Sequence, residues 1–342
     1  MKTRISHSND SNDASGELIT KVYARLLRSF PHTLPFRDPQ IPRWIKNTTR
    51  QIFLIRNGEP ADFGGRRNNG AFRNHNKLAK DSSIVDYKEG SLRERAGNTA
   101  HKQWRTILMD RNQAVVTIKR SGGSENHLDD PPLTQIGRAS AELVGRSLSG
   151  RNFHIHTIYT SPSLRCLQTA IAIISTLNCR EPRRLRIEPA LYEPLSFIGK
   201  VPHFLNSRDL RANGYVCDEH YIPAMSADDL KSSLQQELRP SDIQMRVEKA
   251  VNKILSDWKQ EGGILIISHA PVLDALYRII TNRTDLPRTM GDMQRLLYYY
   301  PHCSVIILQY NPLTEVWENR QDIVPSLTYW HDNCIANVPN FD

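Results

Sequence analysis

Two short runs of apolar residues stand out in the hydropathy pattern, at 52–55 and 264–267. Neither run is interrupted by a polar position, which is typical of a strand buried on both faces in a parallel sheet. Both runs end abruptly in polar residues, Arg56-Asn57-Gly58 after the first and Ser268-His269 after the second. Open α/β sheets bind ligands at the carboxyl ends of their strands, so these two polar turns are the first candidates for a functional site.

Weaker patterns fill the rest of the chain. Strand-like segments lie at 156–160, 185–187 and 304–308, and a hairpin pattern follows the last of them. Apolar residues at helical spacing predict helices near 134–150, 162–174, 243–260 and 270–280. In the third helix we expect an apolar side made of Met245, Val247, Val251, Ile254, Leu255 and Trp258. Alternating strands and helices predict an α/β fold, with a mostly parallel central sheet flanked by helices.

The other segments divide the chain around this core. Residues 1–48 are expected to form a polar extension with a short helix near 17–30, and residues 326–342 a tail. The globular domain is expected over 49–325. A basic insertion at 61–127 interrupts it, and an irregular segment at 200–240, which carries several prolines and aromatics, is expected to form a cap.

The net charge of +9 raises the question of a nucleic-acid partner. Between Ala61 and His127 there are 13 Lys and Arg against 7 Asp and Glu, which gives +6 of the +9. This segment is rich in Gly and Asn and has few large apolar residues, which favours a mobile basic loop over an ordered groove. Few aromatic residues lie among the basic ones, so we do not expect nucleic acid to bind. A solvated insertion and a rim that attracts phosphate are the alternatives.

The chain has no apolar run long enough to cross a bilayer, and residues 1–16 lack the apolar core of a secretory signal. Its cysteines show neither CxxC spacing nor a metal-type Cys/His pattern, and their odd number argues against a disulfide framework; they are Cys166, Cys179, Cys217, Cys303 and Cys334. We therefore expect a cytoplasmic or nuclear protein without membrane contact.

Five motifs carry a resemblance to a known family. They are IRNGE, DPPLTQIG, SPSLRCLQTA, LYEP and ISHAPVLDA, which begin at residues 55, 130, 161, 191 and 267. In this order and at this spacing they resemble the histidine-phosphatase (phosphoglycerate-mutase-like) superfamily. Within it the chain is similar to the phosphatase domain of the ubiquitin-associated and SH3 domain-containing proteins, the suppressors of T-cell receptor signalling. The likeness runs from about residue 51 to residue 308.

The resemblance implies roles for four residues. Arg56 and Arg165 match arginines that bind phosphate, a task suited to guanidinium groups because they are always charged and donate in pairs. His269 matches a histidine that binds and stabilises the transferring phosphoryl group, and Glu193 matches the acid that protonates the leaving oxygen. A phosphotyrosine-bearing protein or a steroid phosphate is the implied ligand, and a homodimer is the implied assembly. No metal or other cofactor is expected, because the arginines already supply the positive charge.

The centre of the motif departs from the family. Where the family has Arg-His-Gly, with the histidine as the nucleophile, this chain has Asn57. An amide nitrogen is not basic near pH 7, so Asn57 cannot form a phosphoenzyme intermediate as imidazole does. A second departure follows, because Pro60 replaces another phosphate-facing arginine of the subfamily pattern. Loss of a covalent nucleophile typically lowers the rate by several orders of magnitude.

Three functions remain open on the sequence alone. The leading one is an inactive or severely impaired phosphatase, a pseudophosphatase that keeps a phosphate pocket and acts by binding a phosphorylated protein or a small phosphomonoester. The second is a weakly active phosphomonoesterase in which His269 or a held water attacks phosphorus. The third is a structural or nucleic-acid-binding protein in which the pocket has no role.

Overall fold

The computed structural model describes residues 50–61, 118–121, 126–151, 153–177, 183–259, 262–320, 338–339 and 341. The chain separates into the units Met1–Arg43 and Trp44–Asp342, and every described residue belongs to the second. The helix expected near 17–30, most of the insertion at 61–127 and most of the tail at 326–342 lie outside the described residues. None of the described helices is long and apolar enough to span a membrane.

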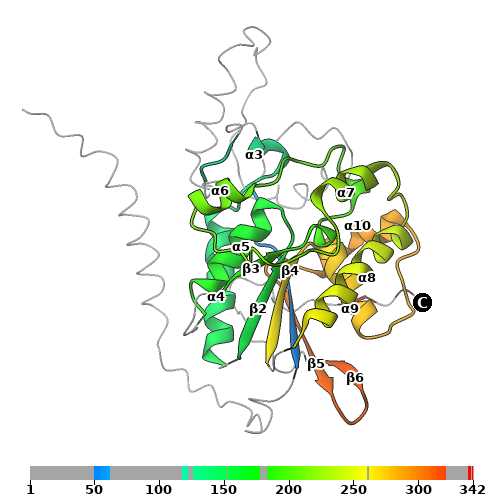
Figure 1. The fold of residues 1–342 in the computed structure, drawn as a ribbon. Coiled ribbons are helices and arrows are strands. Elements are labelled where there is room, and N and C mark those ends of the chain that lie inside the picture. The colour runs from blue at the N-terminus through cyan, green and yellow to red at the C-terminus, as the bar shows by residue number, and fades with distance from the viewer. Residues whose placement is uncertain are drawn as a thin grey trace, which may run out of the picture. The chain divides into compact units, whose positions relative to one another are not determined.

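A six-stranded sheet forms the centre of the domain. Its strands are β1 (Gln51–Arg56), β2 (Ile155–Thr160), β3 (Leu185–Ile187), β4 (Gly263–Ser268), β5 (Val305–Asn311) and β6 (Val316–Asn319). They are ordered β3-β2-β4-β1-β5-β6 (Figure 1). The pairs β2–β3, β2–β4 and β1–β4 are parallel, whereas β1–β5 and the β5–β6 hairpin are antiparallel. The predicted α/β fold with a mostly parallel sheet is therefore confirmed.

The two strongest apolar runs became neighbouring central strands. β1 and β4 pair in register, with Leu54 opposite Ile266 and Arg56 opposite Ser268, and every residue of both strands is buried. The amide of Asn57 donates to the carbonyl of Ser268 at 2.9 Å, so the pairing continues past the end of β1. This register brings the two polar turns predicted from the sequence to the same edge of the sheet.

Helices cover both faces of the sheet (Figure 1). The helices are α3 (Asn126–Asp129), α4 (Gln135–Gly150), α5 (Leu164–Ile174), α6 (Ser207–Ala212), α7 (Ala227–Ser232), α8 (Pro240–Asp257), α9 (Ala270–Ile280) and α10 (Met290–Tyr299), with single 3-10 turns η2 (Pro189–Leu191), η3 (Leu195–Phe197) and η4 (Ser233–Gln235). Figure 1 shows α4 and α5 on one side and α8, α9 and α10 on the other. The main apolar core joins Ile52, Leu54 and Ile266 to α8 and α9.

The predicted apolar side of α8 is wrong at Met245, which is 55% exposed. The helix begins at Pro240, three residues earlier than predicted, and its buried stripe starts from Ile243 and continues through Val247 and Ile254. Positions two residues apart do not share a helix face, so Met245 points away from this stripe.

Two further helical regions were not predicted. The cap segment at 200–240, expected to be irregular, contains α6 and α7, which are capped by the side chains of Asn206 and Ser226. Helix α10 begins with a reciprocal capping pair, Thr289 and Asp292, each side chain accepting from the other residue's backbone amide. In both regions short polar caps start the helix, and such signals are weak when no long apolar stripe follows.

Close backbone contact between the first two motifs, IRNGE and DPPLTQIG, explains why each contains a glycine. Thr134 caps α4 as predicted, by accepting from the amide of Gly137 at 2.9 Å. A Cβ on Gly58 would lie 2.6 Å from the carbonyl oxygen of Gly137, and a Cβ on Gly137 would lie 2.7 Å from the amide nitrogen of Glu59. The start of α4 can therefore lie directly on the turn after β1 only because both residues are glycine.

Gly145→Ala should lower the free energy of unfolding by about 1–3 kcal/mol. Gly145 lies where α4 packs on α5, and an added Cβ would lie 2.5 Å from the carbonyl oxygen of Ile173. Alanine favours helix by up to about 1 kcal/mol, so the clash has to exceed that gain.

Gly150→Ala, at the end of the same helix, is the matched control because an added Cβ there meets nothing within 4 Å. Urea denaturation of both variants measures the difference through the midpoint at constant m value. Equal stability of the two variants would contradict this account of the α4–α5 contact.

Candidate functional site

All five residues singled out from the sequence are buried at the carboxyl edge of the sheet. Arg56 ends β1, Asn57 follows it, and His269 follows β4. Arg165 lies in the first turn of α5, and Glu193 lies in the loop after β3. Their exposed fractions range from 3% for Asn57 to 9% for Arg56. The structure therefore gathers strongly polar groups in a part of the domain that is largely closed to solvent.

Arg165 links two of the other residues directly. Its Nη2 donates to Glu193 Oε1 at 2.7 Å and to His269 Nδ1 at 3.2 Å. Burial opposes the charge on the guanidinium, yet the carboxylate of Glu193 holds the pKa of Arg165 above its ordinary value. Arg165 is therefore a permanent cation, already engaged by an acid and an imidazole.

The contacts of His269 show which of its two ring nitrogens carries the proton. A guanidinium has no acceptor, so Nδ1 must accept from Arg165 and Nε2 must carry the proton. Nε2 lies 2.9 Å from Ser161 Oγ and donates to it. Burial, followed by the charges of Arg165, Arg56 and Arg246, lowers the pKa of His269 well below its ordinary value. The imidazole is therefore neutral near pH 7, and each of its nitrogens has a protein partner.

Arg56 joins the cluster through charge rather than through a hydrogen bond. Its Nη1 donates to the carbonyl of Leu297 at 3.0 Å and to that of Tyr300, at the end of α10. Burial lowers the pKa of Arg56 to about 10, and the charge of Arg165 acts in the same direction, so Arg56 stays charged at neutral pH. Two buried guanidinium groups that repel each other are a favourable setting for an anion.

Asn57 makes mostly backbone contacts. Its Nδ2 donates to the carbonyl of Gly58 at 2.8 Å, and its own carbonyl accepts from the amide of Cys303 at 3.4 Å. The same carbonyl accepts from His302 Nδ1 at 3.1 Å. His302 was not predicted as a site residue. Its position just before β5 could have identified it, because an antiparallel strand begins at the edge of the sheet where its parallel neighbours end.

A buried ion pair that the sequence did not reveal holds the loop of Glu193. Arg246 of α8 binds Glu237 through two bonds of 2.5 and 3.0 Å. The same guanidinium donates to the carbonyls of Tyr192 at 2.8 Å and Glu193 at 3.3 Å. Glu237 accepts from the amide of Leu195 at 2.8 Å. The backbone is thus fixed on both sides of Glu193.

Asp130 is a further buried acid that the sequence did not identify as part of the site. Its Oδ1 accepts from the amide of Leu164 at 2.8 Å, where α5 begins, and its Oδ2 lies 3.5 Å from Arg120 Nη1. Burial raises the pKa of Asp130 to about 6, opposed by the charge of Arg165. Asp130 therefore connects the start of α5, and with it Arg165, to the segment where the insertion returns to the domain.

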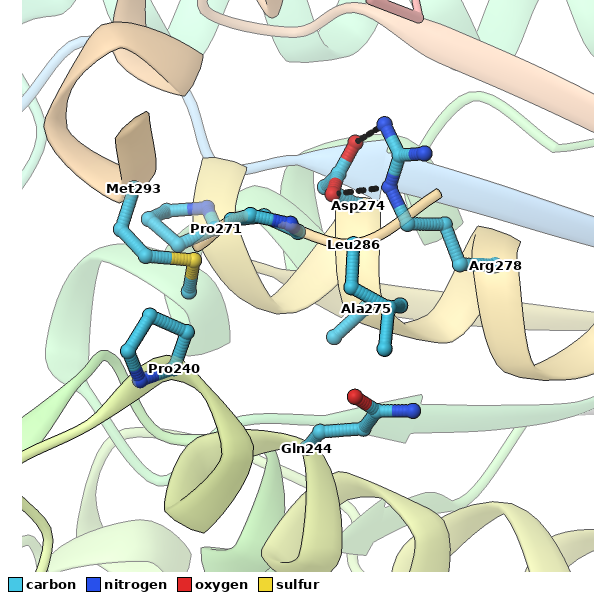
Figure 2. Close-up of a pocket in the computed structure, with 9 residues that line it drawn as sticks. Pro240, Gln244, Pro271, Asp274, Ala275, Arg278, Leu286 and Met293 are labelled. Atoms are coloured by element: carbon cyan, nitrogen blue, oxygen red, sulfur yellow. Dashed lines mark hydrogen bonds and ion pairs between the residues drawn. The ribbon is translucent and has the colours of Figure 1, made fainter. Parts of the chain in front are cut away.

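One further feature lies apart from this cluster. A shallow cleft between α8, α9 and α10 is lined by Pro240, Gln244, Pro271, Asp274, Ala275, Arg278, Leu286, Pro287 and Met293. Figure 2 shows its polar wall, where Asp274 and Arg278 are paired at 2.6 and 3.0 Å. No group of three or more His, Cys, Asp or Glu side chains that could hold a metal ion occurs within the described ranges.

Sequence comparison relates the chain to phosphatases. Residues 118–195 match the model of the histidine phosphatase superfamily (branch 1). The ecdysteroid-phosphate phosphatase of Drosophila melanogaster is 27% identical over 202 residues, which are 58% of this chain and 26% of that protein. The human ubiquitin-associated and SH3 domain-containing protein A is 28% identical over 214 residues, 62% of this chain and 32% of that protein. The chain thus matches about a third or less of the length of these relatives.

Structural comparison shows the same fold. The crystal structure of the ecdysone phosphate phosphatase of Bombyx mori in complex with tungstate superposes with a TM-score of 0.57 and 21% sequence identity. The alignment covers 83% of this chain and 96% of that one. Over residues 118–195 the chain thus matches branch 1 of the histidine phosphatase superfamily, and it is a distant homologue of the ubiquitin-associated and SH3 domain-containing proteins and the ecdysteroid-phosphate phosphatases.

Proposed function

We propose that this chain is a pseudophosphatase, which binds a phosphate-bearing ligand through Arg56, Arg165 and His269 but turns it over very slowly or not at all. The observation that carries the proposal is a buried cluster of two guanidinium groups and an imidazole. The sequence resemblance assigns the neighbouring Asn57 to the position of the family's nucleophile. Buried arginines without a bound anion are unfavourable unless something compensates their charge.

The chemistry of Asn57 supports the loss of turnover. The lone pair of its nitrogen is delocalised into the carbonyl, so this side chain cannot attack phosphorus. His269 is a poor substitute, because Nδ1 accepts from Arg165 and Nε2 donates to Ser161. The attacking lone pair would be that of Nδ1, and it must first give up its hydrogen bond from Arg165, so His269 is not preorganised for the reaction.

The names of the relatives guide the choice of ligand. Two are named as phosphatases of ecdysteroid phosphates, so a steroid phosphate is one candidate. The sequence resemblance gives a phosphotyrosine-bearing protein as the other. We propose a cytoplasmic or nuclear site of action and assembly as a homodimer. Neither a membrane nor a nucleic-acid partner is part of the proposal.

Asn57→His should raise the hydrolysis of an aryl phosphate by roughly two orders of magnitude or more, because it restores an imidazole nucleophile between charged groups that remain in place. Asn57→His with Pro60→Arg should be at least as active. Steady-state kinetics with p-nitrophenyl phosphate measures the gain, and Asn311→His, which adds an imidazole at the far end of β5, is the control. A correctly folded Asn57→His/Pro60→Arg protein that remains inert would contradict the proposal that Asn57 and Pro60 account for the loss of turnover.

A second candidate function is weak phosphomonoesterase activity, and one contact favours it. His302 Nδ1 lies 3.1 Å from the carbonyl oxygen of Asn57, which can only accept, so Nδ1 carries the proton and Nε2 the lone pair. This is the tautomer that a nucleophile or general base requires. The other routes are attack by His269 and attack by a held water.

Variants at the candidate nucleophiles should show which residue causes any residual turnover. Activity that survives Asn57→Ala and is lost in His302→Ala would assign it to His302, whereas loss in His269→Ala alone would assign it to His269. We expect the unmodified chain to show no turnover above that of Arg165→Ala, measured with the same aryl phosphate at matched protein concentration. Turnover well above that baseline would favour the second function over the first.

A further inference from the structure

Glu193 already accepts a hydrogen bond from a donor of Arg165 that a bound phosphate group would also use. Its Oε1 accepts from Arg165 Nη2 at 2.7 Å, and both side chains are almost fully buried. An ionised carboxylate has only acceptors, and so do the unprotonated oxygens of a phosphate. An anion that binds Arg165 therefore comes within reach of another negative charge.

Side-chain contacts hold the loop of Glu193 in place. Arg246 donates to the carbonyls of Tyr192 and Glu193, and Glu237 accepts from the amide of Leu195. Arg246 and Glu237 are themselves buried and paired. Since the backbone is fixed on both sides, the loop keeps Glu193 within reach of Arg165.

The balance of charge favours a singly charged ligand. Arg56 and Arg165 contribute two positive charges, Glu193 contributes one negative charge, and His269 is neutral. Asp130 is compensated by its ion pair with Arg120. The net charge of the cluster is therefore +1, which a monoanion neutralises and a dianion exceeds.

We infer that Glu193 makes this site selective for a protonated phosphate group, whose P–OH donates to the carboxylate while its other oxygens accept from Arg56 and Arg165. This inference rests on the proposed binding function. It adds that the bound phosphate group carries a proton. Sulfate has the same tetrahedral shape but carries no proton near pH 7. Sulfate therefore presents only acceptors to Glu193. Two buried acceptors that face each other cannot form a hydrogen bond, and this lowers the affinity for sulfate.

The test is calorimetric titration of the full chain with inorganic phosphate and with sulfate at pH 7 and constant ionic strength. We expect phosphate to bind at least about tenfold more tightly than sulfate. In Glu193→Gln the amide can donate, so sulfate should bind about tenfold more tightly than before and the preference should largely disappear. Glu219→Gln, which removes an exposed carboxylate, is the control and should keep the preference.

Two results would overturn the inference while leaving the proposed function standing: equal affinities for both anions in the unmodified chain, or an unchanged preference in Glu193→Gln. Failure of both anions to bind to any variant would overturn the proposed function as well. Thermal unfolding of each variant checks that it is folded.

A second measurement on the unmodified chain avoids any folding defect of the variant. The ratio of methyl phosphate to sulfate affinity should fall severalfold from pH 6 to pH 8, because a phosphate monoester loses its only remaining proton across this range. The charged groups facing Glu193 are Arg165, Arg56, Arg246 and Asp130, and titration of Asp130 near pH 6 acts on both anions alike. A ratio that stays constant with pH would contradict a role for the ligand's proton.

Discussion

The in-register parallel pairing of β1 and β4 is the constraint on which the site depends. It aligns Arg56 with Ser268, and so sets the turn after β1 beside the turn that carries His269. A slip of one residue would turn Ile52 and Leu54 away from the core that they share with α8 and α9. The burial of both strands therefore fixes the site as a consequence of packing the core.

Charges buried around this edge are held by partners from distant parts of the chain. Arg165 meets Glu193, Arg56 is held by carbonyls at the end of α10, and Arg246 fixes the loop of Glu193. Removing one member of such a set leaves an uncompensated buried charge, which typically costs several kcal/mol. Few of these contacts involve the side chain of Asn57, so the scaffold does not depend on which residue occupies position 57.

The sequence predicted the fold from local signals, and the five residues singled out from it lie together at one edge of the sheet. Unbroken apolar runs identified β1 and β4, and the polar residues directly after them identified Arg56 and His269. The sequence did not predict the Arg246–Glu237 pair, because an arginine within an amphipathic helix is usually solvated and its buried partners are set by tertiary contacts. His302 and Asp130 were missed for the same reason, since each acts through backbone groups far away in the sequence.

We propose that a tetrahedral anion binds in contact with Arg56, Arg165 and His269 without forming a covalent bond to the protein. A crystal structure of the chain grown with orthovanadate tests this claim most directly. The account predicts one vanadate in contact with Arg56, Arg165 and His269, with no bond from vanadium to a side-chain nitrogen. A cluster that excludes vanadate, or a vanadium–nitrogen bond to a histidine ring, would contradict it.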